Sequence, residues 1–89
     1  MPSIDLVISN KLGLHARAAA KLTQLAGRYQ SDIHISRGNQ RVNAKSIMGV
    51  MMLAAGLGVT VTVDAQGEDA DRALQDIRAL FDSKFGEQE

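Results

Sequence analysis

The pattern of apolar and polar residues changes its period several times along the 89-residue chain. In three segments every second residue is apolar, which predicts a β-strand with one face buried and the other exposed. The alternating apolar residues are Ile4, Leu6 and Ile8, then Ile33 and Ile35, and finally Val59, Val61 and Val63. A fourth, short strand is expected around Val42, because the preceding Gly38-Asn39 pair is typical of a two-residue hairpin turn.

Between the strands the apolar residues recur with the period of a helix. A first helix is predicted from Ala16, and a last helix has Asp69 placed to cap its N-terminus. A short helix is expected between them from Ser46 to Ala55, with Ser46 as its N-cap and Gly56 as its end. The apolar stripes are Ala18, Leu22, Leu25 and Tyr29 on the first helix, and Ala70, Ala73, Leu74, Ile77, Phe81 and Phe85 on the last.

The predicted elements follow the order βαββαβα. This order is typical of an α+β open sandwich, in which helices cover one face of a sheet. A chain of 89 residues has room for one small core, so residues 1–89 are predicted to form a single domain.

The balance of charges argues against several classes of function. The chain has 10 basic and 10 acidic side chains, whereas a sequence-tolerant nucleic-acid binder needs an excess of Lys and Arg. Cysteine is absent, which excludes disulfides, thiol nucleophiles and thiolate metal sites. The first ten residues have no basic segment and no long apolar stretch, so we expect neither a signal peptide nor insertion into a membrane. The expected location is the cytoplasm.

His15 lies between a glycine-containing loop and the first predicted helical turn. At a helix N-terminus the first backbone N–H groups have no helical partner and the dipole is positive, which favours an anion such as phosphate. The same field disfavours imidazolium and keeps the ring nucleophilic. Arg17 can contact phosphate oxygens, and Gly13 allows a tight turn. These residues indicate a phosphorylatable histidine; the alternative is that His15 is only a polar helix cap.

Other chemistries fit the sequence less well. No second His or carboxylate stands at a metal-ligand spacing from His15, and His34 alternates with two isoleucines as a surface residue of a strand. The Gly56-x-Gly58 pair lacks the third glycine of a dinucleotide-binding turn and precedes a strand rather than a helix. We therefore expect neither a metal nor a cofactor.

The predicted short helix is apolar on almost every side. A core of this size cannot cover both of its faces, so part of Ile47, Met48 and Met51 is expected to be exposed. Flexible methionine side chains suit a surface that accepts several partners. This favours partner docking over the alternative that the methionines fill an irregular core. Ser46, taken by itself, is a plain N-cap.

Two motifs resemble the HPr family of histidine phosphocarriers. The first is NKLGLHARAA, from Asn10 to Ala19, and the second is KSIMGVM, from Lys45 to Met51. The resemblance covers essentially the whole chain, because length, element order and both motifs agree. It implies a βαββαβα open-faced sandwich with a four-stranded antiparallel sheet.

The resemblance also implies roles for individual residues. His15 accepts a phosphoryl group at its ring Nδ1 from enzyme I, which takes it from phosphoenolpyruvate, and donates it to an EIIA-type protein. Arg17 stabilises the phosphate, and Ser46 matches the serine that an HPr kinase/phosphorylase modifies in some bacteria. Such a carrier is not itself an enzyme, since turnover needs its partner enzymes. The hydrophobic docking patch that the resemblance implies consists of Ala20, Ile47, Met48 and Met51.

One departure from the family pattern leaves the physiological branch open. Many members have a proline after the arginine, where this chain has Ala18, and either residue fits a first helical turn. The carrier serves sugar uptake, or it resembles the nitrogen-related regulatory carriers, which drive no transport.

Two alternatives lie outside the phosphocarrier class. One is a regulatory module controlled by modification of Ser46, and the other is a small ligand-binding or nucleic-acid-binding module without covalent chemistry. The intact Leu14-His15-Ala16-Arg17 argues against the first alternative. The zero net charge and the scarcity of aromatic residues argue against nucleic acid as the ligand of the second.

Overall fold

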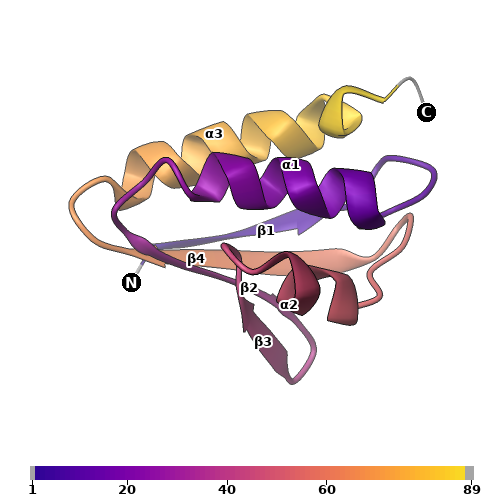
Figure 1. The fold of residues 1–89 in the computed structure, drawn as a ribbon, viewed down its shortest axis with the longest axis horizontal. Coiled ribbons are helices and arrows are strands. Elements are labelled where there is room, and N and C mark those ends of the chain that lie inside the picture. Colours follow the sequence, from indigo (N-terminus) through magenta and orange to yellow (C-terminus); the bar gives the residue numbers. More distant parts are fainter. Residues whose placement is uncertain (1, 88–89) are drawn as a thin grey trace.

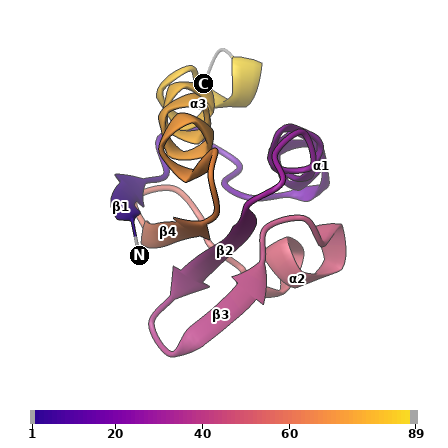
Figure 2. The ribbon, with the colours of Figure 1, turned by 90° about the vertical axis from the view of Figure 1, so that its left-hand side faces the viewer.

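The computed structural model describes residues 2–87 as a four-stranded sheet with three α-helices packed on one of its faces (Figures 1 and 2). The elements are β1 (Ser3–Val7), α1 (Ala16–Ala26), β2 (Asp32–Arg37), β3 (Gln40–Asn43), α2 (Ile47–Met52), β4 (Thr60–Gln66), α3 (Ala70–Asp82) and the 3₁₀ turn η1 (Lys84–Gly86). The strand order is β1-β4-β2-β3, and every neighbouring pair is antiparallel. The predicted α+β sandwich is therefore confirmed.

The buried face of the sheet follows from the register of its strands. Residues directly opposite each other in an antiparallel pair point to the same face, and Val61 of β4 lies opposite Leu6 of β1, while Val63 lies opposite Ile35 of β2. All four side chains are buried. They meet the apolar stripes of α1 and α3 in one core. These two helices lie over the same face of the sheet (Figure 2). No helix within residues 2–87 is long and apolar enough to cross a membrane.

The opposite face of the sheet is polar. The Thr62 hydroxyl donates a hydrogen bond to Asp5 (2.7 Å), and the Arg41 guanidinium donates two hydrogen bonds, of 2.7 and 3.2 Å, to the carboxylate of Asp64. His34 lies on this polar face, with Nδ1 4.0 Å from an Asp64 oxygen. It is thus a surface residue of a strand, as its alternation with isoleucines predicts.

The end of α2 differs from the prediction. The helix ends at Met52 rather than at Ala55, and Ala54 already has a left-handed backbone with φ of 51°. The Arg37 side chain donates from Nη1 to the carbonyl oxygens of Leu53 (3.0 Å) and Ala54 (2.7 Å). Because a distant guanidinium satisfies these carbonyls, the helix does not need Gly56 to terminate it.

The other two helices also end before the last residue of their predicted stripes. α1 ends at Ala26, so Tyr29 lies beyond it, and α3 ends at Asp82, so Phe85 lies beyond it in η1. Phe85 nevertheless belongs to the core, because its ring packs against that of Phe81 with 4.8 Å between the centroids. An apolar residue at helical spacing can therefore be buried by a turn that follows the helix.

Asp69 precedes α3 at the N-cap position, but the predicted capping bond is absent. Its carboxylate instead accepts hydrogen bonds from the backbone N–H groups of Gln30 (2.9 Å) and Ser31 (3.0 Å) and from the Ser31 hydroxyl. These donors, chiefly the Ser31 hydroxyl, lower the pKa of Asp69. The side chain thus joins the α1–β2 connection to the start of α3 instead of capping the helix.

Acid should weaken this connection. Because the pKa of Asp69 is lower in the folded chain than in the unfolded chain, its stabilising effect is complete above the ordinary aspartate pKa and is lost as the pH falls through the folded value. Asp69→Asn should therefore lower the Tm at about pH 7 and have much less effect at about pH 3. Thermal melts at both pH values test this, with the exposed Asp82→Asn as control. A Tm difference that does not change with pH would contradict it.

Candidate functional site

The loop that leads into α1 packs tightly against the connection between α2 and β4. Gly13 has a left-handed backbone with φ of 66°, and a Cβ atom there would lie 2.5 Å from the carbonyl oxygen of Ala55 and 2.6 Å from the Cα of Gly56. The backbone N–H of Leu14 donates to that same Ala55 oxygen (2.9 Å), and the Leu14 side chain is buried. Glycine is therefore required at position 13 both by the backbone conformation and by the close approach.

Asn10 closes this loop from the inside. Its side chain is fully buried and donates from Nδ2 to the carbonyl oxygen of Gly13 (2.8 Å), while the Gly13 N–H donates to the carbonyl of Asn10 (3.2 Å). The loop is held at both ends by its own hydrogen bonds, so the residue that follows Leu14 has a fixed position.

That residue is His15, which is the N-cap of α1. Its ring Nδ1 accepts a hydrogen bond from the backbone N–H of Arg17 (3.2 Å), so Nδ1 has no proton. The other ring nitrogen, Nε2, lies 2.7 Å from Oε2 of Glu87 and donates to it. The side chain is 27% exposed. An unprotonated nitrogen of a partly exposed ring thus lies at the positive end of a helix dipole, where an anion is favoured.

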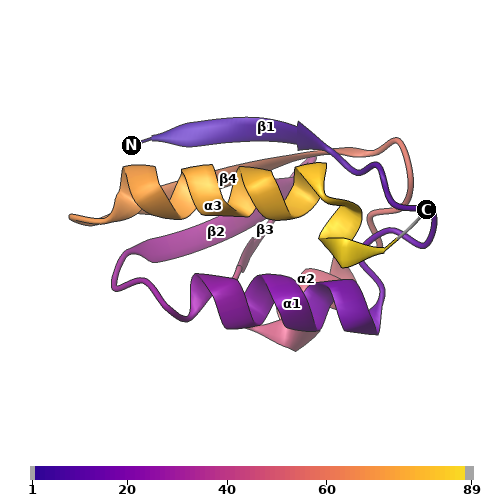
Figure 3. The ribbon, with the colours of Figure 1, turned by 90° about the horizontal axis from the view of Figure 1, so that it is seen from above.

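Glu87 is the part of this site that the sequence analysis missed. Beyond α3, the residues from Lys84 to Gly86 all have positive φ angles and turn the chain back toward the start of α1 (Figures 1 and 3). The turn is anchored by Lys21, whose Nζ donates to the Phe85 carbonyl (2.5 Å), and by Nδ2 of Asn10, which donates to Oε1 of Glu87 (3.2 Å). The only sequence signal was Gly86, a residue type typical of a reversal after a helix.

The hydrogen bonds to Glu87 set its charge. The pKa of Glu87 is lowered, first by the hydrogen bond from His15 and then by the one from Asn10, with a smaller contribution from the charge of Arg17, while burial opposes the shift. Glu87 is therefore ionised at neutral pH. The Arg17 side chain is exposed at the same end of the helix, where sequence analysis predicted it.

The second predicted segment lies beside the first, because α2 packs against α1 (Figure 2). The predicted N-cap of α2 is confirmed, since the Ser46 hydroxyl accepts a hydrogen bond from the Gly49 N–H (3.1 Å). The predicted exposure is also confirmed: Met48 is 67% exposed, and Ile47 and Met51 are each 39% exposed. Ala20 on α1 is half-buried. Four further large apolar residues are exposed that the sequence analysis missed, namely Val7, Leu12, Met52 and Leu57.

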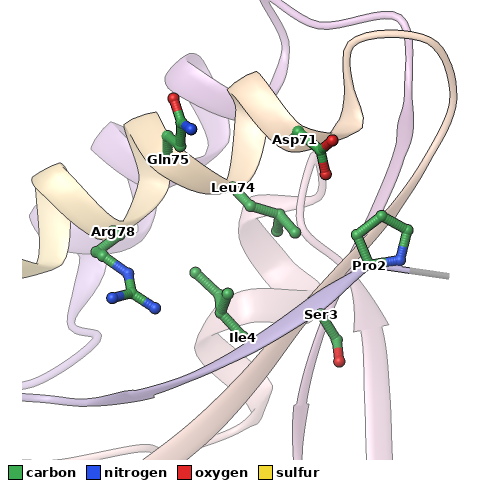
Figure 4. Close-up of a pocket in the computed structure, with 7 residues that line it drawn as sticks. All are labelled: Pro2, Ser3, Ile4, Asp71, Leu74, Gln75 and Arg78. Atoms are coloured by element: carbon green, nitrogen blue, oxygen red, sulfur yellow. The ribbon is translucent and has the colours of Figure 1, made fainter.

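A surface hollow of about 460 Å³ lies between β1 and α3 (Figure 4). The segments that line it, the start of β1 and the first part of α3, lie at the end of the molecule away from the start of α1 (Figure 1). Its floor contains Ile4 and Leu74, and the side chains of Asp71 and Arg78 lie near its two ends. None of the predicted site residues lines it. Within residues 2–87, no three His, Asp or Glu side chains form a cluster that could hold a metal ion.

Known proteins resemble the chain over nearly its whole length. The family model described as PTS HPr component phosphorylation site matches residues 2–83. The chain is 58% identical over 85 residues to phosphocarrier protein HPr of Cupriavidus necator, with 96% of each chain covered. It is 49% identical over 83 residues to phosphocarrier protein NPr of Shewanella violacea, with 93% of this chain and 91% of the relative covered.

A solved structure gives the same result for the fold. HPr-C-His from Thermoanaerobacter tengcongensis matches with a TM-score of 0.96 and 43% identity, over 100% of both chains. Sequence, fold and family model therefore agree over nearly the whole chain. The chain belongs to the HPr family, the phosphocarriers of the phosphotransferase system.

The close approach at Gly13 can be measured by comparison with a second glycine. Gly13→Ala should lower the free energy of unfolding by about 3 kcal/mol, because the new Cβ adds a clash with the Ala55 carbonyl to the cost of a left-handed alanine. Gly38→Ala should cost only about 1 kcal/mol, because φ is also positive there but nothing lies within 4 Å of the added Cβ. Urea unfolding of both variants gives the difference; equal losses would show that the contact does not constrain the loop.

Proposed function

We propose that His15 is the residue that carries the phosphoryl group, accepting it on Nδ1 from enzyme I and passing it to an EIIA-type protein. One observation supports this above the others. The unprotonated Nδ1 of a partly exposed ring lies at the N-terminus of α1, against a backbone N–H. The family model that matches the chain is named for a phosphorylation site, which supports a covalent role for one residue.

The proposed step uses the electron pair that now accepts the Arg17 N–H. When Nδ1 forms its bond to phosphorus, this N–H loses its acceptor on the ring, and a phosphoryl oxygen takes its place. The positive end of α1 then lies against a dianionic group. The exposed guanidinium of Arg17 can pair with two phosphoryl oxygens through parallel N–H bonds, whereas a lysine would offer only a point charge.

The protein acts in this scheme as a carrier without a cofactor, and the partner enzymes catalyse both transfers. We place this exchange in the cytoplasm. Partners dock on the patch formed by Ala20, Ile47, Met48 and Met51, because three of its four side chains are large, apolar and exposed beside the start of α1. Their flexible and polarizable side chains suit two partners in turn.

Sugar uptake is the branch that we propose first, and a nitrogen-related regulatory branch is the second candidate. The regulatory branch stays a candidate because the chain is 49% identical to a protein named NPr. The two are separated by the acceptor: phosphorylated protein is offered a sugar-specific EIIA and a regulatory EIIA, and the faster transfer identifies the branch.

We further propose that Ser46 is a regulatory phosphorylation site for an HPr kinase/phosphorylase. Its hydroxyl accepts a hydrogen bond from the first turn of α2, so a phosphate there would also meet free backbone N–H groups. The modification adds about two negative charges beside Ile47 and Met48.

Replacing His15 tests the central proposal. His15→Ala should lose all acceptance of phosphate from phosphoenolpyruvate and enzyme I, while the fold remains, because the ring is outside the core. His34→Ala is the matched control, since that ring lies on the polar face of the sheet. Intact mass reads the phosphoryl adduct, and lability in acid with stability in alkali identifies phosphohistidine. Labelling of His15→Ala would refute the assignment.

Ser46→Asp should separate stability from docking. The carboxylate can still accept the Gly49 N–H, so the Tm should stay within about 3 °C of wild type. Affinity for enzyme I should fall about tenfold, because a charge beside the apolar patch must be desolvated on binding. The control is Ser3→Asp at the exposed start of β1 (Figure 4). A large loss of Tm would show that Ser46 acts mainly as a structural cap. Unchanged affinity for enzyme I would show that the apolar patch is not part of the docking surface.

A further inference from the structure

We propose that Glu87 is a positioning residue for the phosphoryl transfer, and that its carboxylate holds the proton on Nε2 of His15 while Nδ1 gains and loses the phosphoryl group. The inference rests on the proposed role of His15. It adds a residue from the far end of the chain, which neither the sequence motifs nor the role of Arg17 includes.

The geometry fixes the ring from both sides. Nδ1 accepts the Arg17 N–H at 3.2 Å, and Nε2 donates to Glu87 at 2.7 Å. Both contacts are satisfied by the same tautomer of the ring, in which Nδ1 has no proton and Nε2 is protonated. Two hydrogen bonds at opposite nitrogens also prevent the ring from turning over, so the electron pair of Nδ1 remains directed at the helix N-terminus.

Glu87 is itself held in place. Its second carboxylate oxygen accepts Nδ2 of the buried Asn10 at 3.2 Å, and the same Asn10 donates to the loop that positions His15. The Lys21 ammonium donates to the Phe85 carbonyl, and the Phe85 ring is buried against the core. A carboxylate placed by a buried amide and by a turn that a buried phenylalanine anchors is a built part of the site rather than a passing contact with the surface.

The carboxylate has a chemical role in both directions of transfer. In the forward step Nδ1 forms a bond to phosphorus, the bond from phosphorus to the donor's leaving atom breaks, and that atom keeps its electron pair. The His15 ring retains its Nε2 proton and gains one positive charge, which Glu87 neutralises. In the return step the P–N bond breaks toward Nδ1, and a neutral imidazole leaves. Without the Nε2 proton the leaving group would be an imidazolate, which leaves far less readily.

A purely structural role makes a different prediction. If Glu87 only anchored the turn after α3, its neutralisation would change the Tm and leave the pH dependence of transfer unchanged. If the Glu87 carboxylate instead acts as a counter-charge, it stabilises the proton at Nε2. Removing this negative charge must then shift the pH at which phosphorylated His15 stops being a good phosphoryl donor.

The test compares Glu87→Gln with wild type and with Glu68→Gln, the same change at an exposed position before α3. Each full-length protein is phosphorylated with phosphoenolpyruvate and enzyme I. Transfer from each to an EIIA acceptor is then measured across the pH range, and the Nε2 resonance of the phosphorylated ring is titrated by ¹⁵N NMR. In Glu87→Gln both midpoints should move to lower pH by about one unit, so that transfer on the alkaline side falls about tenfold. Glu68→Gln should match wild type.

The outcomes distinguish the two proposals. If wild type is labelled at His15 and the Glu87→Gln profile coincides with it, Glu87 has no role in proton retention, whatever happens to the Tm. If wild type acquires its phosphoryl group at another residue, the assignment of His15 fails and the inference about Glu87 fails with it.

Discussion

The contact between the backbone at Gly13–Leu14 and the carbonyl of Ala55 holds together the two segments that we assign to function. The first segment is the loop that ends in His15, and the second is the helix α2 with its exposed methionines. A single glycine without a side chain allows this approach, and one backbone hydrogen bond fixes its direction. The rest of the site depends on this contact. The start of α1 and the apolar patch keep their relative positions only while the loop before α1 touches the connection between α2 and β4.

Two interpretations of His15 that looked like alternatives in the sequence describe the same electron pair. As a helix cap, Nδ1 accepts the N–H of Arg17. In the proposed adduct the same nitrogen binds phosphorus, and the N–H turns to a phosphoryl oxygen. A capping histidine is therefore prepared for this chemistry, since the groups that satisfy its lone pair are those that would satisfy the phosphoryl group. In the proposed adduct the helix would lose little stability, because a phosphoryl oxygen would replace the ring nitrogen as acceptor.

The sequence predicted the elements and the first half of the site because both depend on local patterns. The alternation of apolar and polar residues predicted the strands. The residue types at Ser46 and His15 predicted the starts of α2 and α1. What it missed depends on partners far away in the chain. Arg37 ends α2 early, Ser31 draws Asp69 away from its capping position, and Glu87 reaches His15 across 72 positions. The periodicity within a segment does not predict such long-range contacts, because they form only when the core brings the segments together.

The strand order has a consequence for the synthesis of the chain. β4, one of the two inner strands, is made late, at residues 60–66, yet it pairs with both β1 and β2 (Figure 3). The Ala55 carbonyl that holds the loop of His15 comes shortly before it in the chain. A nascent chain that has emerged from the ribosome only as far as α2 contains His15 and Arg17 but lacks β4, which joins β1 to β2, and the Ala55 carbonyl that holds the loop. Unfinished or truncated chains would thus present a histidine with no ordered anion site. The topology makes completion of the fold a condition for entering the phosphoryl relay.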